Sequence, residues 1–147
     1  MRISILLPYK ENFSPSYAGA VSLYLRDIIK ISKFKKKIKV FGSTNYKKKL
    51  LSNYTNIEFS KFFFKSSTKS YLKEFIKIEK KNVSRLIEIH NRPEYVNYIF
   101  NYNQNLVLYF HNNPLEMKSS KSVSERRNIL LKTKKIIFCS NWAMNQF

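Results

Sequence analysis

Short apolar runs recur along the chain, and each has about the length of a β-strand. Several of these runs lack alternation of apolar and polar positions, as expected for strands of a parallel sheet that is covered on both faces. The predicted strands are Ile3–Pro8, Ile38–Gly42, Ile57–Phe63, Leu86–His90, Leu106–Phe110 and Ile136–Ser140.

The segments between these runs carry helical patterns. The apolar positions of Val21–Ile28 are spaced i, i+3, i+4 and i+7, so they share one face of a helix, and those of Leu72–Ile76 do the same. Pro93 and Pro114 stand where a first-turn proline opens a helix. Ser140 offers an N-cap for the last helix.

Alternating strands and helices predict an α/β fold with an open parallel sheet and helices on both of its faces. The expected architecture is Rossmann-like, with about six strands in the order 3-2-1-4-5-6. No internal linker is visible, so residues 1–147 are expected to form a single domain.

Length and cysteine content narrow the class of protein. A chain of 147 residues can bury a core without a disulfide or metal. The single cysteine, Cys139, indicates a reducing compartment and is expected to be a buried small hydrophobe inside a strand. The apolar run at the start of the chain is shorter than the apolar core of a signal peptide. We therefore expect a cytoplasmic protein. Asp27, the one aspartate, is expected at the surface of a helix.

The formal charge of +19 attracts nucleic acid, anionic membranes or acidic substrates. Lysine supplies most of it, with 22 Lys against 6 Arg. Lys, Asn, Ile, Phe and Tyr, whose codons are rich in A and T, together make up 74 residues. Genome composition therefore explains part of the charge, and a function cannot be assigned from charge alone.

Ligands of open parallel sheets bind beyond the carboxyl ends of the strands. The segment after the first strand ends in Ala18-Gly19-Ala20, directly before a helix. Small residues let a ligand approach the backbone there, and the helix dipole with its free N–H groups suits a phosphate. The alternative is a loop that packs closely against a neighbouring element.

The same tetrapeptide pattern, H-N-x-P, follows the fourth and fifth strands at residues 90–93 and 111–114. Its asparagine can cap a helix and its proline can occupy the first turn. Helix initiation does not explain the histidines. His90 and His111 are the only two in the chain, and both are expected at carboxyl ends of adjacent strands, where a histidine can bond a substrate hydroxyl or stabilise developing charge.

Other chemistry finds little support in the sequence. One cysteine and two histidines are too few for a zinc site, so no metal site is predicted. A nucleophile elbow and an acid that would complete a hydrolase triad are both lacking.

The loop at Ala18–Ala20, the segments Ile87–Val96 and Leu106–Met117, and the final IIFCSNWAMNQF resemble the N-terminal domain of family 4 glycosyltransferases of the GT-B fold. The resemblance spans essentially the whole chain. It implies a metal-independent, retaining transferase that moves a sugar from a nucleotide-sugar to a glycan or lipid-linked acceptor. No cofactor is implied, because the nucleotide-sugar is a co-substrate.

The resemblance also implies roles for single residues. Gly19 and Ala20 would face the donor phosphates. His111 would be the catalytic residue, bonding a hydroxyl of the transferred sugar or easing its oxocarbenium-like charge. The remaining implied contacts are His90, Arg92 and Glu94 for the acceptor, and Asn112 and Asn113 for the vicinity of the donor sugar.

Members of this family have a second domain that binds most of the nucleotide-sugar and its diphosphate. That domain is absent from residues 1–147, so we expect the chain by itself to be inactive and to need a donor-binding domain, for example on a separate chain. The same length also fits a truncated gene product or a solitary domain with a binding role.

A basic helix motivates the alternative functions. Its lysines recur every fourth residue beside apolar positions, which suits contact with an anionic membrane at the inner face. These membrane-surface candidates are Lys69, Lys73, Lys77 and Lys81. The simpler interpretation is a helix that covers the sheet and exposes its lysines to solvent. A non-catalytic basic domain that binds membrane or nucleic acid is the second hypothesis, although scarce arginine and the absence of a known motif disfavour nucleic acid.

Overall fold

The computed structural model describes residues 2–59 and 66–147. The chain divides into two compact units, Met1–Arg85 and Leu86–Phe147. Each unit contributes three strands, and the prediction that residues 1–147 form a single domain stays a prediction.

The first unit holds three parallel strands in the order β3-β2-β1, with Ile3 opposite Ile38 and Val40 opposite Tyr54. Its elements are β1 (Ile3–Leu6), α1 (Ala20–Ile31), the 3-10 helix η1 (Lys35–Lys37), β2 (Ile38–Gly42), β3 (Tyr54–Asn56) and α2 (Ser67–Lys81).

Strand β3 lies earlier than the strand predicted at Ile57–Phe63. It ends at Asn56, and residues 57–59 are not in a strand. The rest of the predicted strand lies outside the described residues. The apolar signal at Ile57 has another cause, because this side chain is fully buried at the end of β3 while its N–H donates to the Gly42 carbonyl at 2.7 Å.

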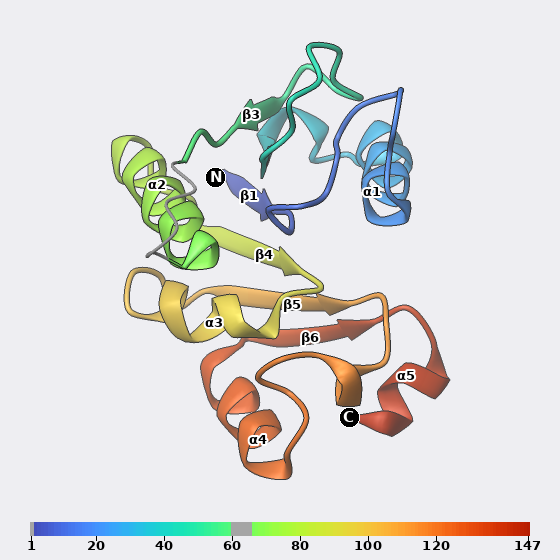
Figure 1. Cartoon of the computed structure of the whole chain (residues 1–147), viewed down its shortest axis with the longest axis vertical. Helices are drawn as coiled ribbons and strands as arrows, with labels where there is room; N and C mark the ends of the chain where they lie inside the picture. The colour runs from blue at the N-terminus through green and yellow to red at the C-terminus, as the bar shows by residue number, and fades with distance from the viewer. Residues whose placement is uncertain (1, 60–65) are drawn as a thin grey trace. The chain divides into compact units, whose positions relative to one another are not determined.

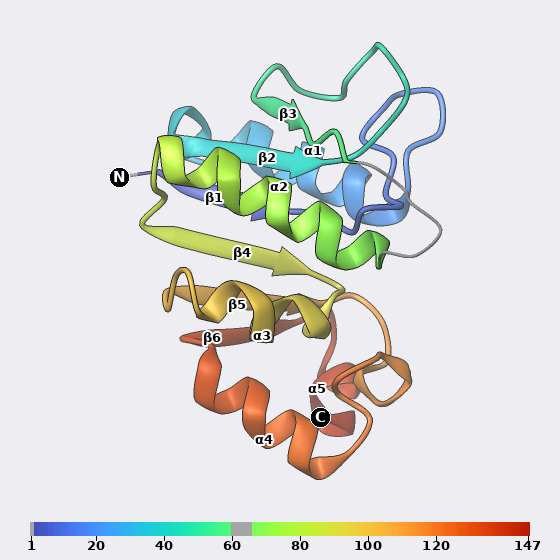
Figure 2. The ribbon, with the colours of Figure 1, turned by 60° about the vertical axis from the view of Figure 1, so that its left-hand side comes forward.

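Helices α1 and α2 cover opposite faces of the strands in this unit (Figures 1 and 2). On one face, Leu25 of α1 belongs to the same core cluster as Ile5 and Val40. On the other face, the Phe75 ring of α2 meets the Phe41 ring edge-on, with centroids 5.2 Å apart. Successive strand residues point to opposite faces, so the non-alternating apolar runs supply both contacts.

A buried carboxylate joins α2 to β1. Glu79, near the end of α2, is fully buried. It accepts hydrogen bonds from the Ser4 hydroxyl at 2.6 Å and the Ser84 N–H at 3.1 Å, and it forms an ion pair with Arg2. A buried charge is tolerated when it is paired and hydrogen-bonded, and these three partners meet that condition.

The second unit holds three parallel strands in the order β4-β5-β6. Helix α3 packs against β4 and β5, and α5 packs against β6. The elements are β4 (Leu86–His90), α3 (Pro93–Phe100), β5 (Leu106–Phe110), the 3-10 helix η2 (Pro114–Glu116), α4 (Val123–Lys132), β6 (Lys135–Phe138) and α5 (Asn141–Gln146).

The predicted helix starts are confirmed with one exception. Pro93 opens α3, and the Ser140 hydroxyl caps α5 by accepting from the Ala143 N–H. Pro114 opens only the 3-10 helix η2. Helix α4 has its own start, where Ser122 and Glu125 form a capping box.

The six strands form an open, all-parallel sheet in the order β3-β2-β1-β4-β5-β6. The predicted α/β, Rossmann-like class and the predicted strand order are both confirmed.

Replacing Glu79 should destabilise the protein strongly, because Glu79→Ala leaves the Arg2 charge without its partner. We expect a loss of about 3 kcal/mol in the free energy of unfolding, measured by urea denaturation. The matched control is Glu74→Ala on the same helix, which removes only the more exposed ion pair with Lys77 and should cost less than about 1 kcal/mol. Equal losses in the two variants would contradict the role assigned to Glu79.

Candidate active site

The two histidines lie together at the carboxyl ends of β4 and β5. His90 is the last residue of β4 and pairs with Tyr109 of β5, and His111 follows β5 directly. His90 Nδ1 and His111 Nε2 are 2.8 Å apart, a hydrogen bond. The prediction that these side chains gather at the ends of adjacent strands is confirmed.

A carboxylate completes this pair, although the sequence pattern did not single it out. Glu88 Oε1 lies 2.6 Å from His90 Nε2. Glu88 and His90 are two residues apart in one strand, so they share a face of the sheet, and this period of two was the signal that could have found Glu88. The result is a hydrogen-bonded chain from Glu88 through the fully buried His90 to His111.

Tyr109 and Asn91 hold His111 in place. The Tyr109 ring stacks on the His111 ring with centroids 4.3 Å apart and an interplanar angle of 12°. The Asn91 side-chain oxygen accepts the His111 backbone N–H at 2.8 Å. Asn91 has a φ of 52°, a left-handed conformation that asparagine tolerates better than most residues. These contacts fix both the ring plane and the backbone of His111.

The asparagines of the H-N-x-P pattern do not cap helices as predicted. Arg92 is the N-cap residue of α3, and Asn91 bonds His111 instead. In the second copy Asn113, rather than Asn112, caps η2 by accepting from the Leu115 N–H. The left-handed turn at Asn91 explains the difference, because it points the side chain toward β5.

The hydrogen bonds constrain the protons on the two rings. A carboxylate only accepts, so His90 donates from Nε2 to Glu88. With both rings neutral, His90 then accepts at Nδ1, and His111 donates from Nε2. Burial and, to a smaller extent, the neighbouring His90 lower the pKa of His111 from 6.5 to about 4, while Glu88 opposes the shift. His111 is therefore uncharged at neutral pH.

A pocket beside the Glu88–His90–His111 hydrogen-bonded chain brings together four of the predicted residues. Arg92, Glu94, Asn112 and Asn113 line a cavity of about 300 Å³. Asn91 also lines it and connects it to His111 through the hydrogen bond described above. The lining carries cations, carboxylates and amides, so it offers hydrogen-bond donors and acceptors to a polar ligand.

Gly19 and Ala20 belong to the first unit, where they are the N-cap and first residue of α1. The Glu11 carboxylate occupies this helix end, accepting the Ser22 N–H at 3.0 Å. A Cβ on Gly19 would meet Glu11 Oε1 at 2.2 Å, so the glycine makes room for this side chain. Phosphate binding here stays a prediction, and it requires Glu11 to leave because two anions repel each other.

Helix α2 carries the membrane candidates. Lys69, Lys73, Lys77 and Lys81 are all exposed. Three apolar residues that the membrane hypothesis placed beside them, Tyr71, Leu72 and Phe75, are instead buried in the core. The buried face of the helix thus covers the sheet, and its lysine face is exposed to solvent. Membrane contact stays a prediction. No helix among residues 2–59 and 66–147 has the length and apolarity needed to cross a membrane.

Cys139 is exposed, which contradicts its predicted burial. Strand β6 ends at Phe138, so Cys139 lies just beyond the strand and its thiol faces the His111 carbonyl at 3.3 Å.

Asp27 is at the surface, as predicted, and pairs with its neighbour Arg26 at 2.7 Å.

Within the described part of the chain, no three His, Cys, Asp or Glu side chains are placed to hold a metal ion. In the Glu88–His90–His111 chain the middle ring separates the other two groups.

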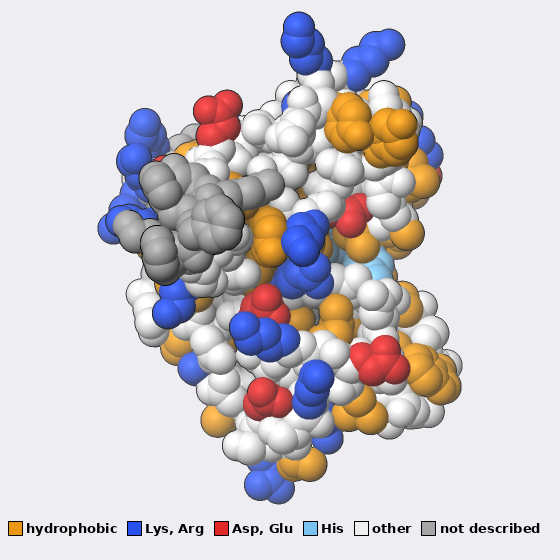
Figure 3. All heavy atoms as spheres, viewed as in Figure 1, with side chains coloured by type: hydrophobic (Ala, Val, Ile, Leu, Met, Phe, Trp, Pro, Cys, Tyr) orange, Lys and Arg blue, Asp and Glu red, His pale blue; other side chains and the backbone are white. Residues whose placement is uncertain are grey.

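Lysine and arginine side chains are scattered over the face shown in Figure 3 rather than gathered in one patch.

No family model matches the chain, and no curated protein matches its sequence. The resemblance to glycosyltransferases therefore stays a prediction that depends on the quoted residues.

The low pKa of His111 makes stability depend on pH. Between pH 6.5 and about 4 the unfolded chain binds more protons at this residue than the folded chain does. The free energy of unfolding should therefore fall as the pH drops through this interval. Urea denaturation at pH 7.5 and pH 5 should show a smaller difference for His111→Gln than for the unaltered protein. The same difference in both would show that His111 is not the group responsible.

Proposed function

We propose that this chain is the acceptor-side domain of a metal-independent, retaining glycosyltransferase that takes its sugar from a nucleotide-sugar. The observation that carries the proposal is the hydrogen-bonded chain Glu88–His90–His111 at the carboxyl ends of β4 and β5. This is the edge of a parallel sheet where ligands bind. The resemblance of the sequence to family 4 glycosyltransferases supplies the reaction class.

The electrostatics of the Glu88–His90–His111 chain suit glycosyl transfer. The transition state of this chemistry resembles an oxocarbenium ion and carries positive charge on the sugar. A protonated histidine beside it would oppose that charge, whereas His111 is neutral at pH 7 because of its low pKa. The Glu88 carboxylate, acting through His90, adds negative potential on the same side.

The protonation pattern also suits a hydroxyl ligand. If His111 donates from Nε2 to His90, its Nδ1 carries the lone pair and accepts hydrogen bonds. A sugar hydroxyl can donate to such an acceptor. His111 would then orient the transferred sugar, while the stacked Tyr109 ring limits its motion.

The neighbouring pocket suits an acceptor rich in hydroxyl groups. Arg92 and Lys118 donate hydrogen bonds, Glu94 and Glu116 accept them, and Asn113 does both. Its two cations and two carboxylates balance, so the pocket does not select a polyanion. A glycan or the sugar part of a lipid-linked acceptor matches this chemistry.

The proposal divides the work between domains. The leaving diphosphate needs cationic groups or N–H donors, which the resemblance assigns to a donor-binding domain. The site around His111 contributes orientation and charge stabilisation at the sugar. Glycoside hydrolases use a pair of carboxylates, whereas the Glu88–His90–His111 chain contains only one.

Binding of carbohydrate tests the proposal directly. The 15N-labelled chain is titrated with UDP-glucose, UDP-N-acetylglucosamine, GDP-mannose and a set of oligosaccharides, and its amide NMR signals are recorded. At least one compound should shift the signals of His111 and Asn91. The His111→Ala variant should weaken that binding, while Arg127→Ala, an exposed residue of α4, should not. If no compound shifts these signals, the proposal fails.

In an active preparation that contains a donor-binding domain, His111→Ala should lower the rate of sugar transfer about 100-fold or more. The loss should appear mainly in kcat, because the interaction strengthens as charge develops. Circular dichroism should show that the variant remains folded, and Arg127→Ala provides the matched control. Unchanged turnover would remove His111 from the mechanism.

A further inference from the structure

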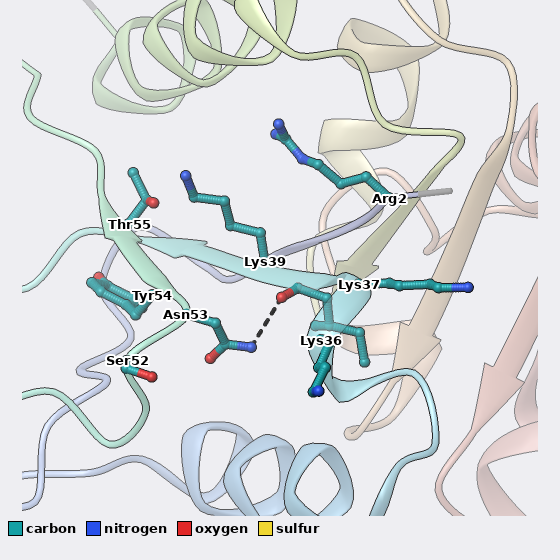
Figure 4. Close-up of a pocket in the computed structure, with 9 residues that line it drawn as sticks. Arg2, Lys36, Lys37, Lys39, Ser52, Asn53, Tyr54 and Thr55 are labelled. Carbon is teal, nitrogen blue, oxygen red and sulfur yellow. Dashed lines mark hydrogen bonds between the residues drawn. The ribbon is translucent and has the colours of Figure 1, made fainter.

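A second hollow lies in the first unit, at the amino ends of its strands. It has a volume of about 430 Å³ and is lined by four cationic side chains, those of Arg2, Lys36, Lys37 and Lys39 (Figure 4). Arg2 precedes β1, and Lys36 and Lys37 precede β2. All of its lining residues belong to the Met1–Arg85 unit, and none of them is a residue that the proposed function uses.

The lining of the hollow is one-sided in charge. Among the residues that the structure describes, no aspartate or glutamate lines it. An adjoining hollow of about 400 Å³ shares Lys36 and Asn53 with it, adds Lys30 and Lys35, and has no acidic lining residue either. The pocket beside His111 in the same protein has two cations and two carboxylates.

The cations surround the end of β2 rather than converge on one point. In Figure 4, Arg2 and Lys39 extend to one side of the strand, while Lys36 lies on its other side with Asn53. A single phosphate cannot meet all of them at hydrogen-bond distance. A ligand with several linked phosphates can reach from one side to the other.

Two of the cations are held in position by neighbours. Arg2 is bonded to the buried Glu79, and its guanidinium carbon lies 5.6 Å from the centroid of the Phe41 ring. The Lys39 amine lies 5.7 Å from the same centroid. Cations that are already positioned lose less side-chain entropy when an anion binds.

Two lining side chains also keep a buried polar atom that has no partner among the described residues. These atoms are Arg2 Nε and Asn53 Oδ1. Asn53 Oδ1 only accepts hydrogen bonds, and the Asn53 nitrogen already donates to the Ile38 carbonyl at 3.0 Å, so Asn53 does not count in favour of an anion. A buried donor such as Arg2 Nε normally has an acceptor as its partner, and a bound anion can supply one.

We propose that this hollow is a binding site for anions with two or more linked phosphates, such as a polyphosphate or a diphosphate ester. The free cations supply charge-assisted hydrogen bonds, and Arg2 keeps its partner Glu79 on binding. The site lies in the Met1–Arg85 unit and does not depend on the histidine chain.

The test uses isothermal titration calorimetry with inorganic tripolyphosphate, at low and at physiological salt. The unaltered protein should bind tripolyphosphate more tightly than orthophosphate. The double variant K36Q/K39Q should weaken tripolyphosphate binding by about tenfold. The matched control K47Q/K48Q removes the same charge from exposed lysines outside both hollows and should change the affinity less than about threefold, because exposed distant charges are screened.

Three outcomes would overturn the proposal: no binding of tripolyphosphate, equal weakening in the two double variants, or equal affinity for orthophosphate and tripolyphosphate. A competition arm identifies the natural source of the phosphates. Displacement of tripolyphosphate by vesicles that contain a lipid with a diphosphate headgroup, lost in K36Q/K39Q, would support a lipid headgroup. Retention of tripolyphosphate against vesicles would support a soluble ligand. Circular dichroism verifies that the variants are folded.

Discussion

The candidate active site depends on the parallel register of β4 and β5. Pairing His90 with Tyr109 puts Glu88, His90 and Tyr109 on one face of the strands and brings His111 to the end of that face. A shift of one residue in either strand would turn its members to the opposite face and break the chain of hydrogen bonds. Buried side chains on both faces, such as Ile89 and Leu108, make that shift costly.

Carboxylates organise the described parts of this basic protein more than their number suggests. The chain has nine acidic residues against 28 basic ones. Glu79 joins a helix to a strand, Glu88 orients the histidines, and Glu11 satisfies the start of α1. Each accepts hydrogen bonds from groups of its own unit, so these three side chains hold the structure in place instead of only offsetting surface charge.

The lysines fall into groups with different surroundings. Those of α2 form a solvated face whose helix is anchored by Phe75 and other buried residues. Those at the amino end of β2 line hollows whose described lining residues include no carboxylate. The same residue type thus forms a solvated helix face in one place and lines a hollow in the other.

Much of the fold could be predicted from the sequence because its signals are local. Apolar runs of strand length, helical spacing and first-turn prolines predicted the α/β class and the meeting of His90 with His111. The strand order was predicted from the usual order of Rossmann-like sheets. The errors arose where an apolar residue serves a purpose other than the expected one. Ile57 is buried just after the end of β3, although a strand was expected to begin there, and Cys139 lies beyond the strand that was expected to bury it.

The sequence by itself determined which residues stand at strand ends, because chain direction and hydrophobic period are properties of the order of residues. Only the tertiary structure decided their partners. Glu88 joined His90, Asn91 turned to His111 instead of capping a helix, and Glu11 took the helix end expected to hold a phosphate. Such choices depend on distances and competing hydrogen bonds between separate segments, which no local pattern encodes.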